Sequence, residues 1–141
     1  MSYLLDTCTI SEFARPVPEP RLLAWLESQP ESSLYTSAVV LGELARGVAR
    51  LEEGSKKRRL NAWLHGDLPA RFADRVLGVT AEIALSWGRI SGEVSGRGIT
   101  VSMADGLIGA TAIIHSLTVV TRNVENIAAT GALVLNPWED V

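Results

Sequence analysis

The sequence has one cysteine, Cys8, and two histidines, His65 and His115, among its 141 residues. A single cysteine cannot form an internal disulfide and is typical of a reducing cytosol, so we expect a cytoplasmic protein. One thiol and two imidazoles also argue against a structural zinc site, which needs more ligands of these types. These shortages exclude a disulfide-stapled secreted scaffold and disfavour a zinc finger.

Long apolar runs are also missing. No run approaches the roughly 18 residues needed to span a bilayer as a helix. The start, Met1 to Asp6, has no basic segment and places an acid after a very short apolar run, so we expect no signal peptide. A composition of 47% hydrophobic and 21% charged residues is typical of a chain that buries a sizeable core. The length predicts one domain over residues 1–141.

Positive charge is not in excess either. The formal net charge is −3, so no global basic field indicates nucleic-acid binding. The negative total does not exclude such binding, because acids gathered around a divalent metal would leave the remaining surface more basic. Composition alone leaves this question open.

Short apolar runs alternate with helical patterns along the chain. The expected strands are Tyr3–Leu5, Leu34–Thr36, Val76–Val79, Leu117–Val120 and Leu133–Leu135. Helices are expected to begin near Thr9, Arg21, Ser37, Gly54, Thr80, Ser102 and Asn123. This alternation predicts an α/β fold, with a short central parallel β-sheet flanked by helices on both faces.

Three acids fall near the ends of these elements. Asp6 directly follows the first strand, where parallel sheets bind ligands. Asp6 could instead cap a helix, but Thr9 and Glu12 already form a plausible capping box, which favours a functional carboxylate. Glu43 borders an apolar helical stripe, where a lone glutamate is most often solvated. Asp105 lies in a first helical turn, where the helix dipole alone would stabilise an acid.

Glycines accompany the two helical acids. They are Gly42 and Gly47 beside Glu43, and Gly106 and Gly109 beside Asp105. Each costs about 1 kcal/mol relative to alanine in a helix interior, so the four indicate close approach of a backbone or a ligand. Three carboxylates without a neighbouring histidine suit Mg²⁺, and without a cation or a proton they would repel one another. The residues therefore predict metal-assisted phosphoryl transfer or phosphodiester hydrolysis.

Five segments occur in a characteristic order. They are Leu4–Thr7, Val39–Leu44, Ala104–Ala112, Thr121–Asn123 and the closing Asn136–Trp138. Together they resemble the PIN domain of VapC-type toxins over essentially the whole chain. The resemblance implies a PIN fold and a Mg²⁺-dependent endoribonuclease, in which Mn²⁺ can substitute. It also implies a dimer that a cognate VapB-type antitoxin holds inactive in a heterotetramer or larger assembly.

The resemblance also assigns residues. Asp6, Glu43 and Asp105 become catalytic metal ligands. The expected RNA-contacting residues are Thr7, Thr121, Arg122 and Asn123, and Arg122 follows a strand end where a phosphate contact is plausible.

The chain departs from the family pattern at one position. Many relatives carry a fourth acid where this chain has Asn126, and some carry Asp where Asn123 stands. Glu125 is one residue away but points about 100° off if the segment is helical. Asn126 could act through a water that its amide holds, or a second metal could bind weakly.

Other groups leave alternatives open. The basic run Lys56–Arg59 is either a solvated helix face or a contact for RNA or an acidic partner segment. We interpret Cys8 as a small buried hydrophobe. Because the fourth acid is absent, a weakly active PIN-fold module that binds an antitoxin or RNA is the alternative function. A magnesium phosphatase is a weaker candidate, since the haloacid dehalogenase pattern wants an acid where Cys8 stands.

Overall fold

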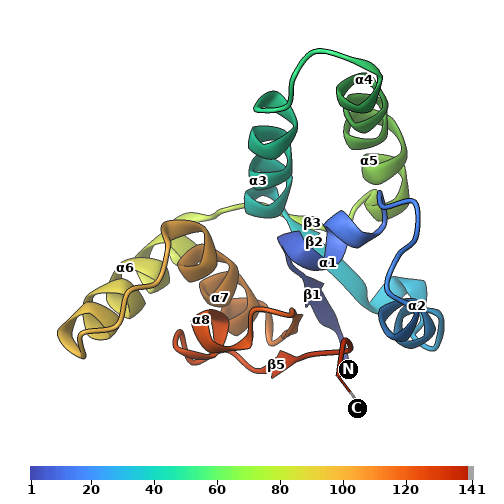
Figure 1. Cartoon of the computed structure of the whole chain (residues 1–141). Helices are drawn as coiled ribbons and strands as arrows, with labels where there is room; N and C mark the ends of the chain where they lie inside the picture. The colour runs from blue at the N-terminus through green and yellow to red at the C-terminus, as the bar shows by residue number, and fades with distance from the viewer. Residues whose placement is uncertain (140–141) are drawn as a thin grey trace.

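A short parallel sheet organises residues 1–139, which the computed structural model describes (Figure 1). Its strands are β1 (Tyr3–Leu5), β2 (Leu34–Ser37), β3 (Val76–Leu77), β4 (Thr118–Val120) and β5 (Val134–Leu135). They lie in the order β3-β2-β1-β4-β5, and every neighbouring pair is parallel. The predicted α/β class with a parallel sheet is confirmed.

Helices cover the sheet on both faces. They are α1 (Thr7–Glu12), α2 (Pro20–Glu27), α3 (Ala38–Ala49), α4 (Ser55–Ala62), α5 (Leu68–Phe72), α6 (Ala81–Gly96), α7 (Met103–His115) and α8 (Val124–Ala128). Tyr3, Leu4 and Leu5 of β1 are all buried, and successive strand residues point to opposite faces, so both faces are covered. In Figure 1, α6, α7 and α8 lie to one side of β1, and α2, α4 and α5 lie to the other.

Hydroxyl side chains start three of the helices as their sequence predicts. Ser37, Thr80 and Ser102 each accept a hydrogen bond from the backbone N–H three residues further on. His65 lies in a π-helical turn, Trp63–Asp67, between α4 and α5. Every helix within residues 1–139 is too short or too polar to span a bilayer.

The buried side chains form two apolar clusters. The larger one surrounds the sheet, and three tryptophans pack against its border: Trp25, Trp63 and Trp138. The smaller one lies between α6 and α7 and includes Ile83, Ile90 and Leu107, with Trp87 packed against it. Each of the four tryptophans therefore packs against one of the two clusters.

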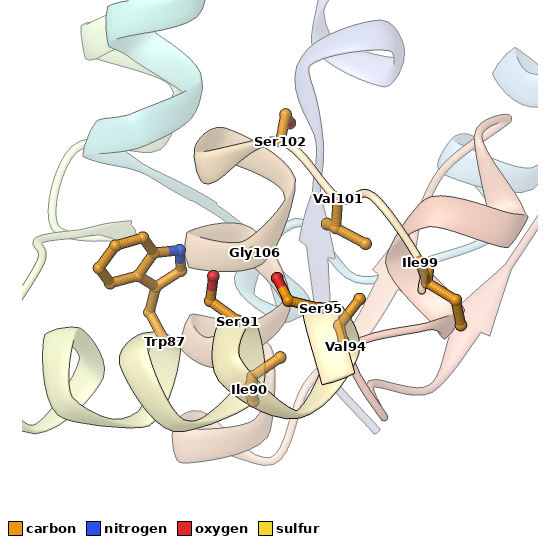
Figure 2. Close-up of a pocket in the computed structure, with 9 residues that line it drawn as sticks. All are labelled: Trp87, Ile90, Ser91, Val94, Ser95, Ile99, Val101, Ser102 and Gly106. Carbon is orange, nitrogen blue, oxygen red and sulfur yellow. The ribbon is translucent and has the colours of Figure 1, made fainter. Parts of the chain in front are cut away.

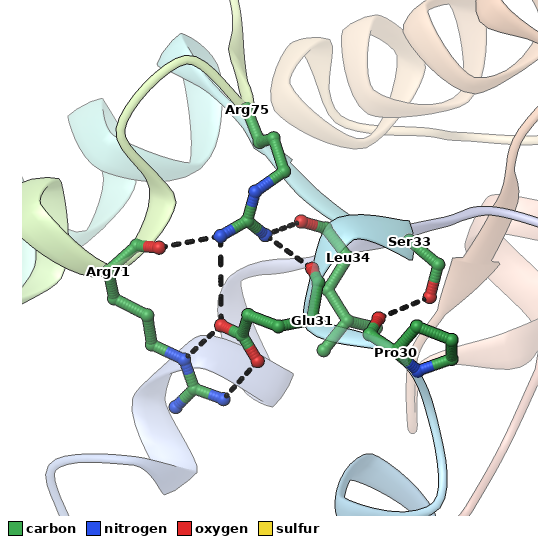
Figure 3. Close-up of polar contacts among 6 residues, drawn as sticks. All are labelled: Pro30, Glu31, Ser33, Leu34, Arg71 and Arg75. Atoms are coloured by element: carbon green, nitrogen blue, oxygen red, sulfur yellow. Dashed lines mark hydrogen bonds and ion pairs between the residues drawn. The ribbon is translucent and has the colours of Figure 1, made fainter.

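Arg75 fastens the end of α5 to the start of β2 (Figure 3). Its guanidinium donates to the carbonyl oxygens of Glu31 at 2.7 Å, of Arg71 at 2.7 Å and of Leu34. The side chain is only 15% exposed and also lies 3.8 Å from a carboxylate oxygen of Glu31. The guanidinium of Arg75 thus satisfies carbonyl oxygens from two segments. It holds the chain that includes α4 and α5 against the edge of the sheet.

Replacing Arg75 by Ala should lower the free energy of unfolding by about 2–3 kcal/mol, because hydrogen bonds to charged groups contribute about 1.5–3 kcal/mol and the carbonyls would lose their donor. Arg89→Ala is the matched control, since Arg89 meets Glu93 only at 4.0 Å on an exposed helix face. Arg89→Ala should lower the free energy of unfolding by less than about 1 kcal/mol. Urea denaturation measures both, and equal losses would contradict this role for Arg75.

Candidate active site

The carboxyl end of β1 lies where the order of strands across the sheet reverses. The chain moves from β1 outward to β2 and β3, then returns to place β4 on the other side of β1. Leu5 pairs with Val120, so Asp6 follows β1 next to Thr121, which follows β4. Ligands of open α/β sheets bind at such a switch point.

Asp6 caps α1 and is 5% exposed. Its Oδ1 accepts from the backbone N–H of Thr9 at 3.1 Å, from the Thr9 hydroxyl at 2.9 Å and from the Cys8 thiol at 3.0 Å. The predicted capping box of Thr9 and Glu12 was wrong, because the helix begins two residues earlier, at Thr7. All three bonds use Oδ1, so capping leaves Oδ2 of Asp6 for another ligand.

Glu43 is held from the first residue of α1. The Thr7 hydroxyl donates to Oε1 of Glu43 at 2.5 Å, in a partly buried contact. This bond joins α1 to α3 directly beside Asp6. Sequence reasoning missed the supporting role of Thr9, although its spacing of three from Asp6 is the spacing of a capped N–H.

Asp105 is partly buried in the first turn of α7, where its backbone N–H donates to the Ser102 hydroxyl at 3.1 Å. Burial raises the pKa of the Asp105 carboxyl, the charges of Glu43 and Asp6 raise it further, and the Ser102 hydroxyl opposes the shift. Glu43 and Asp6 therefore lie close enough to Asp105 to repel its carboxylate. Within residues 1–139, none of the three takes part in an ion pair.

The donor set fits a hard divalent cation. It consists of carboxylate and hydroxyl oxygens, the ligands that Mg²⁺ and Mn²⁺ prefer, and nearby cations do not neutralise its charge. In the described chain, no three His, Cys, Asp or Glu side chains lie close enough to hold an ion directly. Mg²⁺ does not need such a cage, because it keeps several waters and uses one or two protein carboxylates.

The segment after β4 borders the same site. Thr121 is fully buried, and its hydroxyl accepts from the backbone N–H of Asn123 at 2.8 Å. The backbone N–H of Arg122 donates to the Cys8 sulfur at 3.4 Å. The Arg122 guanidinium lies over the Trp138 ring, 5.5 Å from its centroid. The closing segment that contains Trp138 thus contacts the loop that carries Arg122.

Cys8 is interpreted from the sequence as a small buried hydrophobe, but it is only partly buried and its thiol donates to Asp6. Burial and the charge of Asp6 raise the pKa of its thiol to about 11. The thiol is therefore protonated at neutral pH and can donate to Asp6.

Asn126, the position of the absent fourth acid, is exposed on α8, as is Glu125. In the described chain, neither side chain has a hydrogen bond to Asp6, Glu43 or Asp105. Asn123 is exposed at the start of α8 and does not cap it with its side chain. Glu43 and Asp6 thus lie near Asp105, whereas no hydrogen bond within residues 1–139 joins Asn123 or Asn126 to these acids.

Of the glycines beside the helical acids, the two that follow Asp105 allow close packing of side chains from neighbouring segments. A Cβ on Gly106 would lie 2.8 Å from Trp87, and one on Gly109 would lie 2.7 Å from the Cβ of Thr130. Gly42 has open space beside it, as does Gly47, which is exposed at the rim of a groove. The close approach expected at Gly106 and Gly109 is made by side chains, those of Trp87 and Thr130, whereas at Gly42 and Gly47 no described protein atom comes close and the approach of a ligand stays a prediction.

A groove of about 480 Å³ opens beside Thr7 and Glu43, between α1, α3 and α4. Its apolar lining consists of Leu44, Val48, Leu51, Leu60 and Trp63. Lys56 and Arg59 add positive charge, and Arg15, which pairs with Glu12 at 2.8 Å, also lines the groove. Lys57 belongs to the same basic run but pairs with Glu53 at 2.7 Å. Sequence reasoning found the run but could not tell which of its members face the groove.

Comparison with known proteins places this chain in a family. The PIN domain model matches residues 3–132. Toxin FitB of Neisseria gonorrhoeae is 41% identical over 97% of this chain and 99% of its own length. VapC ribonuclease Y4jK of Sinorhizobium fredii is 33% identical over 96% of this chain and 97% of its own. The structure of FitAB bound to an IR36 DNA fragment is similar at a TM-score of 0.89 and 37% identity, covering 99% of this chain and 97% of that one.

The fold is that of a PIN domain, with acids at the carboxyl edge of a parallel sheet. The chain belongs to the PIN-domain family, in the group of FitB and VapC toxins.

Without metal, Asp105→Asn should raise the free energy of unfolding near pH 7. The pKa of Asp105 is raised in the folded state, so its contribution to stability is full below the unfolded-state pKa and is lost as pH rises through the folded-state pKa. The advantage of the variant over the wild type should therefore grow from acidic pH to neutral pH. Urea denaturation in EDTA over this range measures the difference. A pH-independent difference, or a less stable variant at pH 7, would contradict the repulsion.

Proposed function

We propose that the chain is a metal-dependent endoribonuclease and the toxin of a VapBC-type toxin–antitoxin pair. The observation that carries the proposal is the convergence of Asp6, Glu43 and Asp105 at the switch point of the sheet, where burial raises the pKa of Asp105 and the charges of Glu43 and Asp6 raise it further. RNA as substrate is supported by the 33% identical relative named a VapC ribonuclease.

Each part of the site has a task under this proposal. Asp6, Glu43 and Asp105 would hold Mg²⁺ or Mn²⁺, which supplies an activated water and stabilises the leaving oxygen of the phosphodiester. Thr9 and Thr7 fix the carboxylates of Asp6 and Glu43 by hydrogen bonds, so those groups are oriented before the cation arrives.

The loop after β4 would contact the RNA backbone. Thr121 shapes the backbone of this loop through its bond to the N–H of Asn123, and the exposed Arg122 carries the positive charge that a phosphate requires. Asn126 would act at the fourth position by holding a water with its amide, since no acid stands there.

A cognate VapB-type antitoxin is the proposed protein partner, with a homodimer as the unit that it binds. The groove beside Glu43 suits a partner segment with apolar and acidic side chains, because its lining is apolar and its charged residues are mostly basic. A segment placed there would cover one border of the site.

An RNA substrate fits an activity in the cytoplasm.

The alternative function is a weakly active PIN-fold module that mainly binds an antitoxin or RNA. The absent fourth acid and the size of the groove favour it. Purified protein incubated with total RNA, with and without Mg²⁺, separates the two proposals, because only an enzyme creates new 5′ ends at defined sites.

Asp6→Asn, Glu43→Gln and Asp105→Asn should each lower the rate of RNA cleavage at least about 10²-fold while the fold persists, since each removes an anionic ligand of the cation that would stabilise the reacting phosphate. Glu52→Gln is the control, because Glu52 is exposed and lies outside the site. Circular dichroism checks the fold and sequencing of 5′ ends measures cleavage. Cleavage at the wild-type rate in any of the three would remove that residue from the site.

Replacing Lys56 and Arg59 by Ser should weaken binding of single-stranded RNA and of the antitoxin. For RNA, the slope of log affinity against log salt should fall by roughly 1–1.5, because each phosphate that is no longer neutralised lowers it by about 0.7. Lys57→Ser with Arg58→Ser removes the same charge away from the groove and should change the slope less. Binding is measured in the Asp6→Asn background to prevent cleavage. If the two double variants change binding equally, Lys56–Arg59 is only a solvated helix face.

A further inference from the structure

Trp87 of α6 lies against the turn of α7 that carries Asp105. A Cβ built on Gly106 would lie 2.8 Å from Cδ1 of Trp87 and 2.9 Å from its Nε1. Such distances leave no room for a side chain, so the indole edge can occupy this place only because residue 106 is glycine. Figure 2 shows the indole directed from α6 toward the α7 turn at Gly106. Asp105 is the residue immediately before that contact.

The same packed region reaches the helix that carries Glu43. Val39 and Trp87 both pack against the apolar cluster between α6 and α7. Val39 lies four residues before Glu43 on α3, so the two share one face of that helix. Trp87 therefore belongs to the packing that joins α3 to α7 near the two carboxylates.

The small cavity beside Trp87 does not explain the indole as a ligand contact. It measures about 20 Å³ and has Ser91, Ser95 and Ser102 in its lining (Figure 2). This volume fits a single water and no nucleotide. The position of Trp87 is therefore a matter of helix packing, with Ser102 bonded to the backbone of Asp105 on the far side of the cavity.

We propose that Trp87 is a positioning residue for Asp105, which it places relative to Glu43 by fixing the first turn of α7. The inference rests on the proposed metal site. Close-packed helices transmit small displacements, and a metal site tolerates only about 0.5 Å of error in its ligands. A side chain at residue 106 would compete with the indole edge for the same space. It should therefore move Asp105 and weaken metal binding, although neither Trp87 nor Gly106 would touch the metal.

Gly106→Ala tests the inference, because its methyl group would overlap the indole. Mn²⁺ binding to the folded protein, followed by the electron paramagnetic resonance signal of free Mn²⁺, should weaken about 10-fold, as expected for residues that orient ligands. Gly42→Ala is the matched control: it adds the same methyl group next to Glu43, where nothing lies within 4 Å. Its Mn²⁺ affinity should equal that of the wild type.

Two further variants complete a double-mutant cycle of Trp87 and Gly106. Trp87→Phe removes part of the indole and should weaken Mn²⁺ binding by itself, which keeps the test valid if Gly106→Ala fails to fold. Trp87→Phe with Gly106→Ala should bind Mn²⁺ better than Gly106→Ala alone, since the smaller ring leaves room for the methyl group.

The outcomes separate this inference from the proposed function. If Gly106→Ala and Trp87→Phe lower the melting temperature but bind Mn²⁺ as the wild type does, Trp87 is only a packing residue and the inference is overturned. If the wild type itself binds no Mn²⁺, or if Asp105→Asn binds it equally well, the proposed metal site fails and takes the inference with it.

Discussion

The approach of Glu43 and Asp6 to the partly buried carboxyl of Asp105 is the constraint on which the candidate site depends. The three acids come from different helices or helix starts; burial raises the pKa of Asp105, and the charges of Glu43 and Asp6 raise it further. Folding must therefore hold together groups that would separate in free solution. The structure does so with a buried parallel sheet, since β1 pairs on both sides and fixes where Asp6 emerges. A divalent cation would turn this unfavourable contact into a favourable one.

Capping and function are combined in the same residues. Asp6 accepts the hydrogen bonds of a helix start through one carboxylate oxygen and keeps the other free. Ser102 caps α7 and thereby orders the turn in which Asp105 lies. Thr7 begins α1 and holds Glu43. Local helix chemistry thus gives each acid a defined orientation at little additional cost, and the α6–α7 packing adds a second level of support.

How far the sequence predicted this arrangement depended on the range of each interaction. The parallel sheet, the helix caps at Ser37 and Ser102 and the position of Asp6 follow from local patterns, and these were predicted. The contacts of Gly106 with Trp87 and of Thr7 with Glu43 join segments far apart in the chain, so no local pattern contained them. The predicted capping box of Thr9 and Glu12 was wrong for another reason. Asp6 and Thr9 are both possible N-caps, and the end of β1 determines that Asp6 is the one that starts the helix.

A crystal structure of the protein with Mn²⁺, located by its anomalous scattering, tests the central claim most directly. The account predicts an anomalous peak among Asp6, Glu43 and Asp105, within coordination distance of at least one of their carboxylates and with waters completing the shell. It also predicts that the peak is lost in Asp105→Asn crystals under the same conditions. A peak elsewhere on the protein, or none at saturating Mn²⁺ while RNA cleavage still requires the ion, would contradict the account.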